Sequence, residues 1–200
     1  ADDKTPLAKT KVVLKNVTNG TSLETMTDED GNYAFSDMER ECLYEVSVAF
    51  ENCSESKEKT STVGVRGDKE ITVNITMFCK GAVIRVDNIY YDYNKSDIRP
   101  DAALELDKLV ALMEKYPAMK IELGSHTDAR GDDKYNMSLS DKRAKSAVAY
   151  IVSKGIDTKR IKAKGYGETV ILNRCANDVE CFEEEHAFNR RTEFKILSVK

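Results

Sequence analysis

The sequence predicts two domains of different class: an N-terminal all-β sandwich and a C-terminal α/β fold, an α+β sandwich with helices on one sheet face. Up to about residue 80, short segments alternate apolar and polar residues, which is typical of half-buried strands. After the stretch "CKGAV", helical periodicity appears between strand-like segments. We therefore place the domains at 1–80 and 81–200.

The N-terminal strands are expected at "KVVLKNV", "YEVSVAF" and "KEITVNITM", with "TNGTS", "DEDGN" and "RGD" as turns between strands. Asp28, Asp30 and Asn32 alternate as in some calcium loops, but no bidentate acid follows at EF-hand spacing. Turn formation is therefore the favoured explanation of these three residues. The stretch "TDEDGNYAFSDM" resembles the repeated turn of carboxypeptidase regulatory-like domains, which implies inward aromatics at Tyr33 and Phe35.

The C-terminal elements follow the order strand–helix–strand–helix–strand–strand (βαβαββ). Strands are expected at "VIRVDNIYYDYN", "MKIELGS", "RIKAKGYG" and "RRTEFKILSV". The first helix is expected to begin at Pro100. It places four apolar residues on one face: Leu106, Leu109, Val110 and Met113.

The second helix is expected to begin with a capping box from Ser138 to Asp141 and to end at Gly155. Its predicted core stripe consists of Ala144, Ala147, Val148 and Ile151.

Composition excludes some functions. The net charge of −4 shows no strongly basic balance, so we expect no nucleic-acid partner. No run of eighteen apolar residues is present, so no direct membrane span is expected. The polar start "ADDKTPLAKT" does not resemble a signal peptide, which favours a mature form or a piece of a longer protein.

Five cysteines favour an oxidising compartment such as a periplasm. The close pair Cys175 and Cys181 suggests a disulfide that braces an inserted acidic loop. The pairing of Cys42, Cys53 and Cys79 stays open, because connectivity cannot be deduced from sequence.

Asp128 precedes Arg143 by fifteen positions in the stretch "GSHTDARGDDKYNMSLSDKRAKS". Together with "IYYDYNKSDIRPDA", "IKAKGYGE" and "NRRTEFKI", this stretch resembles the successive signatures of the OmpA C-terminal-like family, which includes the peptidoglycan-associated lipoprotein and the stator subunit MotB. The resemblance covers about Val83 to Val199. It implies non-covalent binding of the peptidoglycan stem peptide through its diaminopimelate, with no catalysis and no cofactor.

The residue types suit this ligand, whose free end carries an ammonium and a carboxylate on one carbon. Asp128 can accept from the ammonium, and Arg143, expected in the first turns of the second helix, can hold the carboxylate in a bidentate fork. The resemblance implies Asp92 as a second acceptor for the amine. The remaining residues expected to shape the pocket are Thr127, Asn136, Leu139 and Ser140.

These residues also allow interpretations other than ligand binding. A charged pair on a protein surface is usually an ion pair worth under about 1 kcal/mol. His126 and Asp128 could mimic a catalytic dyad, but no nucleophile elbow or zinc motif accompanies them, so a packed strand histidine is favoured. Cys175, Cys181 and His186 fit no common zinc module, so no metal site is expected.

The "NRR" segment, comprising Asn189, Arg190 and Arg191, is expected to organise the preceding loop and the last strand, which leaves Arg191 a weak site candidate. A β-sandwich directly before an OmpA-like domain resembles a Bacteroidetes arrangement found in envelope proteins, including the PorE-type subunit of the type IX secretion system. The resemblance implies a periplasmic anchor that links an outer-membrane-associated protein complex to peptidoglycan. The alternative is a structural adaptor that uses the same fold for protein–protein contact.

Overall fold

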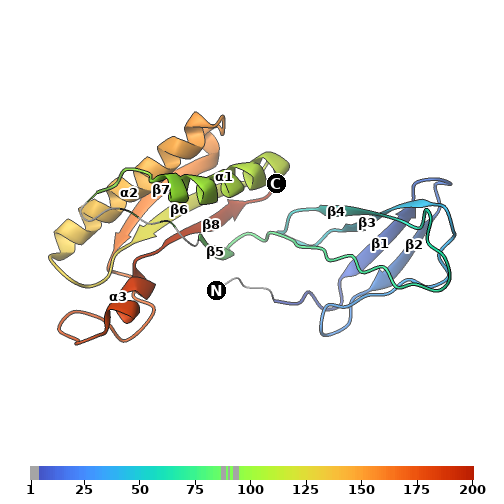
Figure 1. Cartoon of the computed structure of the whole chain (residues 1–200), viewed down its shortest axis with the longest axis horizontal. Coiled ribbons are helices and arrows are strands. Elements are labelled where there is room, and N and C mark those ends of the chain that lie inside the picture. Colours follow the sequence, from blue (N-terminus) through green and yellow to red (C-terminus); the bar gives the residue numbers. More distant parts are fainter. Residues whose placement is uncertain (1–4, 87–88, 90, 92–94) are drawn as a thin grey trace. The chain divides into compact units, whose positions relative to one another are not determined.

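The computed structural model describes residues 5–86, 89, 91 and 95–200. The chain divides into two compact units, one ending at Cys79 and the other beginning at Lys80. We call them the N-terminal and the C-terminal domain. The predicted fold class is confirmed: a four-stranded antiparallel β domain precedes a mixed α/β domain (Figure 1).

The N-terminal domain contains one antiparallel sheet in the order β2-β1-β3-β4. Its strands are β1 (Lys11–Asn16), β2 (Ser22–Met26), β3 (Leu43–Val48) and β4 (Ser56–Ser61). The alternating pattern buries one face of the two central strands, where Val12 pairs with Val48 and Leu14 pairs with Val46 across the ladder.

The second layer over this face is less regular than expected. No strand is assigned to "KEITVNITM" within the described chain, so this part of the prediction is wrong. The alternation still reports burial, because Val73, Ile75 and Met77 pack against the core beside Tyr33 and Phe35. Alternation therefore indicated which side chains face inward, but it did not guarantee that the backbone pairs in a ladder.

Two local features of this domain settle open points. Cys53 forms a disulfide with Cys79, and Cys42 is a free, buried thiol. The Asp28 carboxylate accepts hydrogen bonds from the backbone N–H groups of Asp30 and Asn32, at 3.0 and 2.8 Å. These bonds are typical of an Asx turn, so turn formation explains the three residues.

The C-terminal sheet has the order β5-β8-β6-β7, in which only β6 and β7 are parallel. Its strands are β5 (Val83–Val86), β6 (Lys120–His126), β7 (Ile161–Gly167) and β8 (Thr192–Ser198). The helices are α1 (Pro100–Lys115), α2 (Asp133–Ser153), the short η1 (Thr158–Arg160) and α3 (Glu183–Asn189).

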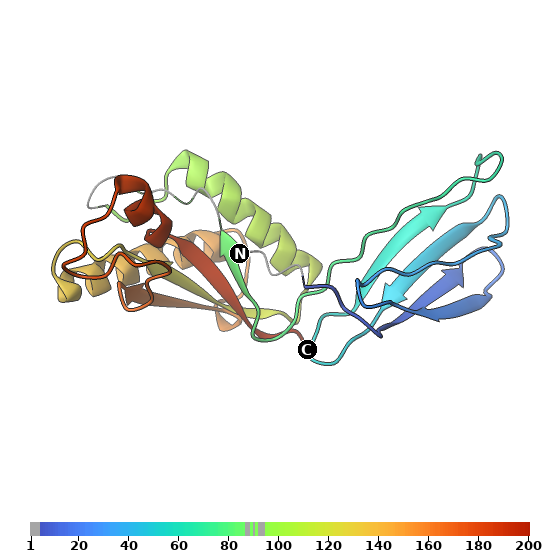
Figure 2. The ribbon, with the colours of Figure 1, turned by 90° about the horizontal axis from the view of Figure 1, so that it is seen from below.

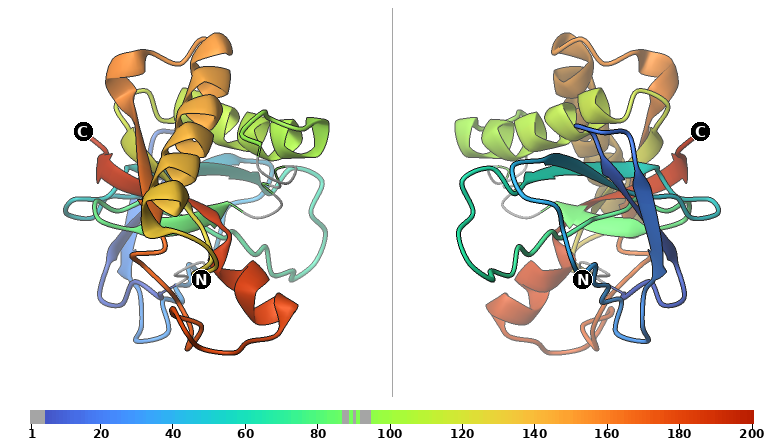
Figure 3. Two further views of the ribbon diagram at one scale, coloured as in Figure 1. Left: turned by 90° about the vertical axis from the view of Figure 1, so that its left-hand side faces the viewer. Right: turned by 90° about the vertical axis from the view of Figure 1, so that its right-hand side faces the viewer.

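Helices α1 and α2 lie on the same side of this sheet, and α3 lies on the other side of β8 (Figures 1 and 3). Helix α3 and the loop before it project from the end of the sheet at which β8 begins, beside the loop between β6 and α2 (Figure 2). Segments far apart in sequence, about 127–131 and 170–190, thus meet at one end of the domain.

The first helix agrees with its prediction, including Pro100 at its start and the buried stripe at Leu106, Leu109, Val110 and Met113. The second helix begins earlier than predicted. Asp132 caps it, and its carboxylate accepts from the N–H groups of two residues in the first turn.

This cap overturns two expectations about the second helix. The Ser138–Asp141 capping box is wrong, because both residues lie inside α2. Arg143 lies in the third turn of α2, so the free N–H groups of the first turn cannot assist it in binding an anion.

The buried stripe of α2 also differs from the prediction. Val148 is half-buried rather than part of the core, while Asn136 and Ser140 are buried on the sheet-facing side.

Helix α3 was expected as part of an acidic loop, and this expectation is wrong. The three acids that begin it, Glu183 to Glu185, lie where the helix dipole favours negative charge. The Glu185 carboxylate also accepts from the backbone N–H of Phe182 at 2.9 Å. The acidic run therefore begins a short helix, not an irregular loop.

Helix α2 lies so close to β7 that no side chain fits between them at Gly165. A Cβ atom added there would lie 2.3 Å from the backbone nitrogen of Asp141 and 2.6 Å from its Cα. These are backbone atoms of a helix, so they cannot move aside cheaply. Gly165 therefore sets the distance between α2 and the sheet, and with it the position of the loop that precedes α2.

We predict that Gly165→Ala destabilises the C-terminal domain by about 1–3 kcal/mol or more, because the added methyl group must push α2 away from β7. Thermal unfolding measures the effect. Lys162→Ala, at an exposed position of the same strand, is the matched control. Equal melting temperatures for Gly165→Ala and Lys162→Ala would show that α2 can move away from β7 without loss of stability.

Candidate functional site

The loop between β6 and α2 carries Asp128 and is anchored at both ends. The N–H of Thr127 donates to the carbonyl of Gly167 at 2.9 Å, which ties the loop to β7. On the α2 side, Asn136 Nδ2 donates to the carbonyl oxygens of Asp128 and Arg130 at 3.3 and 3.1 Å. The Asp128 side chain is only 9% exposed, so its direction is fixed by the fold.

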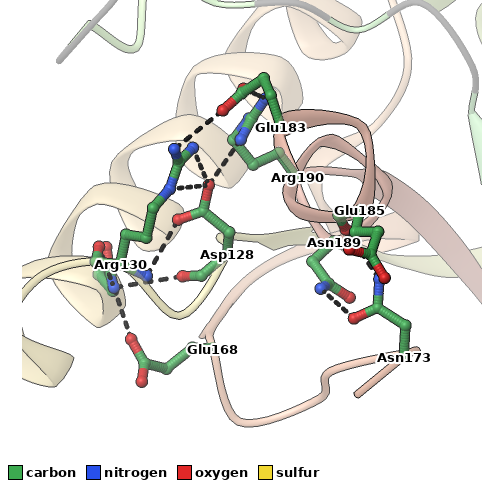
Figure 4. A network of polar contacts seen from close by, with 9 residues as sticks. Asp128, Arg130, Glu168, Asn173, Glu183, Glu185, Asn189 and Arg190 are labelled. Carbon is green, nitrogen blue, oxygen red and sulfur yellow. Dashed lines mark hydrogen bonds and ion pairs between the residues drawn. The ribbon is translucent and has the colours of Figure 1, made fainter. Parts of the chain in front are cut away.

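The Asp128 carboxylate accepts from two arginines. Oδ1 accepts from the backbone N–H of Arg130 at 3.1 Å, and Oδ2 accepts from Arg130 Nη2 at 2.8 Å and Arg190 Nη1 at 2.6 Å. Glu183 on α3 pairs with the same two guanidinium groups, at 2.9 Å to Arg130 and 2.6 Å to Arg190. We call these four residues the charge ring (Figure 4).

The charge ring balances two negative and two positive groups. Burial by itself raises the pKa of Asp128, but the hydrogen bonds from Arg130 and Arg190 outweigh it and hold the pKa below its ordinary value of 3.8. The hydrogen bonds from the same arginines lower the pKa of Glu183. Asp128 is therefore a fixed, ionised anion at neutral pH.

Arg143 is near the ring but makes different contacts. Its Nε donates to the carbonyl of Lys95 at 3.1 Å, and its guanidinium lies 4.7 Å from the centre of the Tyr91 ring. Burial lowers the pKa of Arg143, and Asp128 is close enough to oppose that shift. In this structure the cations hydrogen-bonded to Asp128 are Arg130 and Arg190, whereas the guanidinium of Arg143 lies over the ring of Tyr91.

The other predicted site residues lie around the same loop. The hydroxyl of Ser140 accepts from the N–H of Gly167 at 2.8 Å, and Leu139 is half-buried on α2. The Oγ1 atom of Thr127 is buried, and the described part of the chain offers it no hydrogen-bond partner. Asp92 lies outside the described residues.

His126 takes no part in a dyad with Asp128. Its ring stacks on Tyr166 at 4.8 Å between centroids, and Nε2 lies 3.0 Å from the carboxylate of Glu193. The His126 side chain is the main cause that lowers the pKa of Glu193 to about 2, with burial opposing it and Arg191 assisting. His126 is thus a packed, partnered strand histidine, as favoured from the sequence.

The loop before α3 is closed by the predicted Cys175–Cys181 disulfide. The two sulfur atoms and a Glu185 oxygen lie within 4.8 Å of one another, which resembles a ligand set for a metal. Sulfur binds metals as thiolate, and these sulfurs are bonded to each other. Glu185 also pairs with Arg174, at 3.1 Å.

The three residues of the "NRR" segment make different contacts. Asn189 accepts from the N–H of Leu172 at 2.9 Å and donates to Asn173 at 2.8 Å, which shapes the loop before α3 (Figure 4). The buried Arg191 pairs with Glu193 at 3.1 Å, as an organising residue should. Arg190 departs from the expected role, because it turns toward Asp128.

The contacts of Arg130 and Glu183 in the charge ring were not predicted from the sequence. Arg190 was expected to organise the preceding loop and the last strand, but it contacts Asp128. Arg130 stands two residues after Asp128, a spacing at which an Asx-type turn brings its N–H to the carboxylate. The "EEE" run before an apolar segment signals a helix start, and this signal could have placed Glu183 on a helix. Nothing in the local sequence shows that α3 meets the Asp128 loop.

Comparison with known proteins finds a family match for each of the two domains. Residues 90–183 match the model of the OmpA family. The chain carries an OmpA family domain. Residues 1–77 match the carboxypeptidase regulatory-like domain, so that domain precedes the OmpA domain. The match to the OmpA family agrees with the expectation that this chain is not an enzyme.

Individual relatives match part of the chain. The chain is 41% identical over 83 residues to photosystem I P700 chlorophyll a apoprotein A2 of Gloeobacter violaceus, covering 42% of this chain and 10% of the relative. It is 33% identical over 105 residues to the peptidoglycan-associated lipoprotein of Rhizobium meliloti, covering 52% and 57%. Among solved structures, the cell wall anchor of the T6SS from Pseudomonas aeruginosa is 22% identical with a TM-score of 0.48, covering 58% of this chain and 79% of the other.

The chain thus spans about a tenth of one of these curated relatives and somewhat over half of the other. In the part of the chain that the structure describes, no helix combines the length and the apolar character needed to cross a bilayer.

The contact of the half-buried Glu193 with the buried His126 in the OmpA domain predicts a pH dependence of stability. The Glu193 pKa falls from 4.5 to about 2 on folding, so its stabilisation is fully present above about pH 5 and is lost as the pH falls toward 2. The shift corresponds to at most about 3 kcal/mol.

Urea unfolding of the wild type and Glu193→Gln between pH 7 and pH 2 tests this. We expect the stability difference between the two to shrink on acidification, since protonation turns the wild-type side chain into a neutral one as well. Glu184→Gln is the control, because it removes the charge of an exposed side chain directly after Glu183 in sequence. Its free energy of unfolding should follow that of the wild type at every pH.

Proposed function

We propose that the OmpA domain binds peptidoglycan non-covalently through the diaminopimelate of the stem peptide. The observation that carries this proposal is Asp128: a nearly buried carboxylate, ionised at neutral pH, fixed by a strand-to-helix loop and surrounded by arginine side chains. A fixed anion beside fixed cations is the arrangement that a small zwitterion requires.

The diaminopimelate side chain ends in an ammonium and a carboxylate on one carbon. Asp128 suits the ammonium, since a carboxylate bonds a cationic donor more strongly than a neutral one. Arg143, whose guanidinium lies over the ring of Tyr91, suits the carboxylate. The buried Thr127 hydroxyl, which lacks a partner among the described residues, adds a donor or acceptor next to Asp128. By family resemblance, Asp92 joins Asp128 at the amine.

The comparisons support the same class of ligand. A relative with 33% identity is named peptidoglycan-associated lipoprotein, and its matching segment covers 57% of that protein. Two disulfides favour an oxidising compartment, consistent with a periplasmic, outer-membrane-associated location. We further propose that the N-terminal domain connects the anchor to an envelope complex, for which the type IX secretion system is the candidate suggested by the domain order.

A second candidate function is a structural adaptor. The observation in its favour is the exposure of two aromatic side chains at the ends of α3, Phe182 at 75% and Phe188 at 47%. Exposed aromatic residues are enriched in protein–protein contacts. Absence of co-sedimentation of the wild type with purified sacculi would favour this candidate over the first.

We predict that Asp128→Ala or Arg143→Ala abolishes co-sedimentation with purified sacculi, because each removes one pole of the zwitterion site. Circular dichroism should show an unchanged fold. Asp97→Ala and Lys142→Ala remove charges of the same sign from exposed positions and should sediment as the wild type does. Full sedimentation of both site variants would contradict the proposal.

A further inference from the structure

The charge ring contains a cation that the family match does not include. The match to the OmpA family model ends at residue 183, whereas Arg190 lies beyond it and makes the shortest contact to Asp128, 2.6 Å from Nη1 to Oδ2. The side chain of Arg190 is 33% exposed, so solvent and ligands can reach it. A cation that approaches Oδ2 of Asp128 must therefore displace Nη1 of Arg190 from it.

The Oδ2 atom of Asp128, which Arg190 contacts, has no spare acceptor capacity in this state. A carboxylate offers about four lone-pair positions, two on each oxygen. Oδ2 accepts from Nε and Nη2 of Arg130 and from Nη1 of Arg190, whereas Oδ1 accepts from the backbone N–H of Arg130. The bonds from Arg130 come from a residue two positions away on the same loop and hold that loop together. The single bond from Arg190 comes from a distant segment, so it is the one that a ligand can replace with the least rearrangement.

A zwitterion can replace this bond without leaving a charge unpaired. Its ammonium takes the place of Arg190 at Asp128, and its carboxylate takes the place of Asp128 at Arg190. A ligand with an ammonium alone can do only the first half, so Arg190 loses its partner at Asp128. Leaving a charged group without its partner is costly, which makes the exchange selective for a ligand that carries both charges.

Glu183 keeps Arg190 in place during such an exchange. It binds Arg190 Nη2 at 2.6 Å, while Asp128 binds Nη1, so the two carboxylates use different ends of the guanidinium. The side chain of Glu183 is 60% exposed and belongs to α3, which the Cys175–Cys181 loop precedes. Once Nη1 leaves Asp128, the bond to Glu183 holds Arg190 near the site with free N–H donors for a carboxylate.

We propose that the Asp128–Arg190 ion pair is opened by the ligand and that Arg190 receives the ligand's carboxylate, so that Arg190 determines the preference for diaminopimelate over lysine. This inference rests on the proposed function and deepens it. Arg190 acts together with Arg143, and Glu183 is a positioning residue for Arg190.

Isothermal titration of the whole chain with two stem peptides, one containing diaminopimelate and one containing lysine at the same position, tests the proposal. We expect the wild type to prefer the diaminopimelate peptide. In Arg190→Gln the affinity for that peptide should fall about tenfold or more, the loss expected for one charge-assisted hydrogen bond. Affinity for the lysine peptide should stay unchanged or rise, because Arg190 no longer competes for Asp128. Arg190→Lys should restore part of the preference.

Lys142→Gln is the matched control, since it removes one positive charge from an exposed position of α2 next to Arg143. Glu183→Gln should narrow the preference and Glu184→Gln should not. If Arg190→Gln binds both peptides with the wild-type preference, or loses affinity for both equally, Arg190 does not bind the carboxylate of the diaminopimelate side chain. The inference is then wrong. If the wild type binds neither peptide, the proposed function itself fails.

Discussion

The ion pair between Asp128 and Arg190 is the interaction on which the site depends. It joins the loop after β6 to the segment between α3 and β8, two parts of the chain that are 62 residues apart. Each partner has a second support: Asp128 is held by Arg130, and Arg190 is held by Glu183. The same contacts that close this end of the domain place opposite charges where a zwitterionic ligand can exchange with them.

The surrounding fold gives these charges fixed positions. Gly165 lets α2 lie against β7, Asp132 begins α2 at the end of the loop, and Asn136 ties the loop carbonyls to the helix. Behind the loop, the stacked His126 and the Glu193–Arg191 pair stabilise the ends of β6 and β8. Charged groups that are held in place beforehand lose less entropy on binding than flexible ones, which suits a small, highly polar ligand.

Much of the fold of the C-terminal domain could be predicted from the sequence, because hydrophobic periodicity and turn residues indicate local structure. The α1 stripe, the four C-terminal strand regions and Asp128 at the end of β6 follow from pattern alone. The predicted start of α2 at Ser138 is too late, because Asp132 and Ser138 are both residue types that cap helices. Local sequence does not decide between them, whereas the packing of α2 against β7 does. The contacts of Arg190 and Glu183 with Asp128 depend on how distant segments meet, and no local pattern encodes that.

A structure of the chain with a diaminopimelate-containing muropeptide tests the central claim most directly. The account predicts the ligand ammonium within hydrogen-bond distance of Asp128 and the ligand carboxylate on arginine, with Arg190 Nη1 withdrawn from Asp128 and Nη2 still on Glu183. A muropeptide bound elsewhere, with the Asp128–Arg190 pair intact as in the unliganded chain, would contradict it.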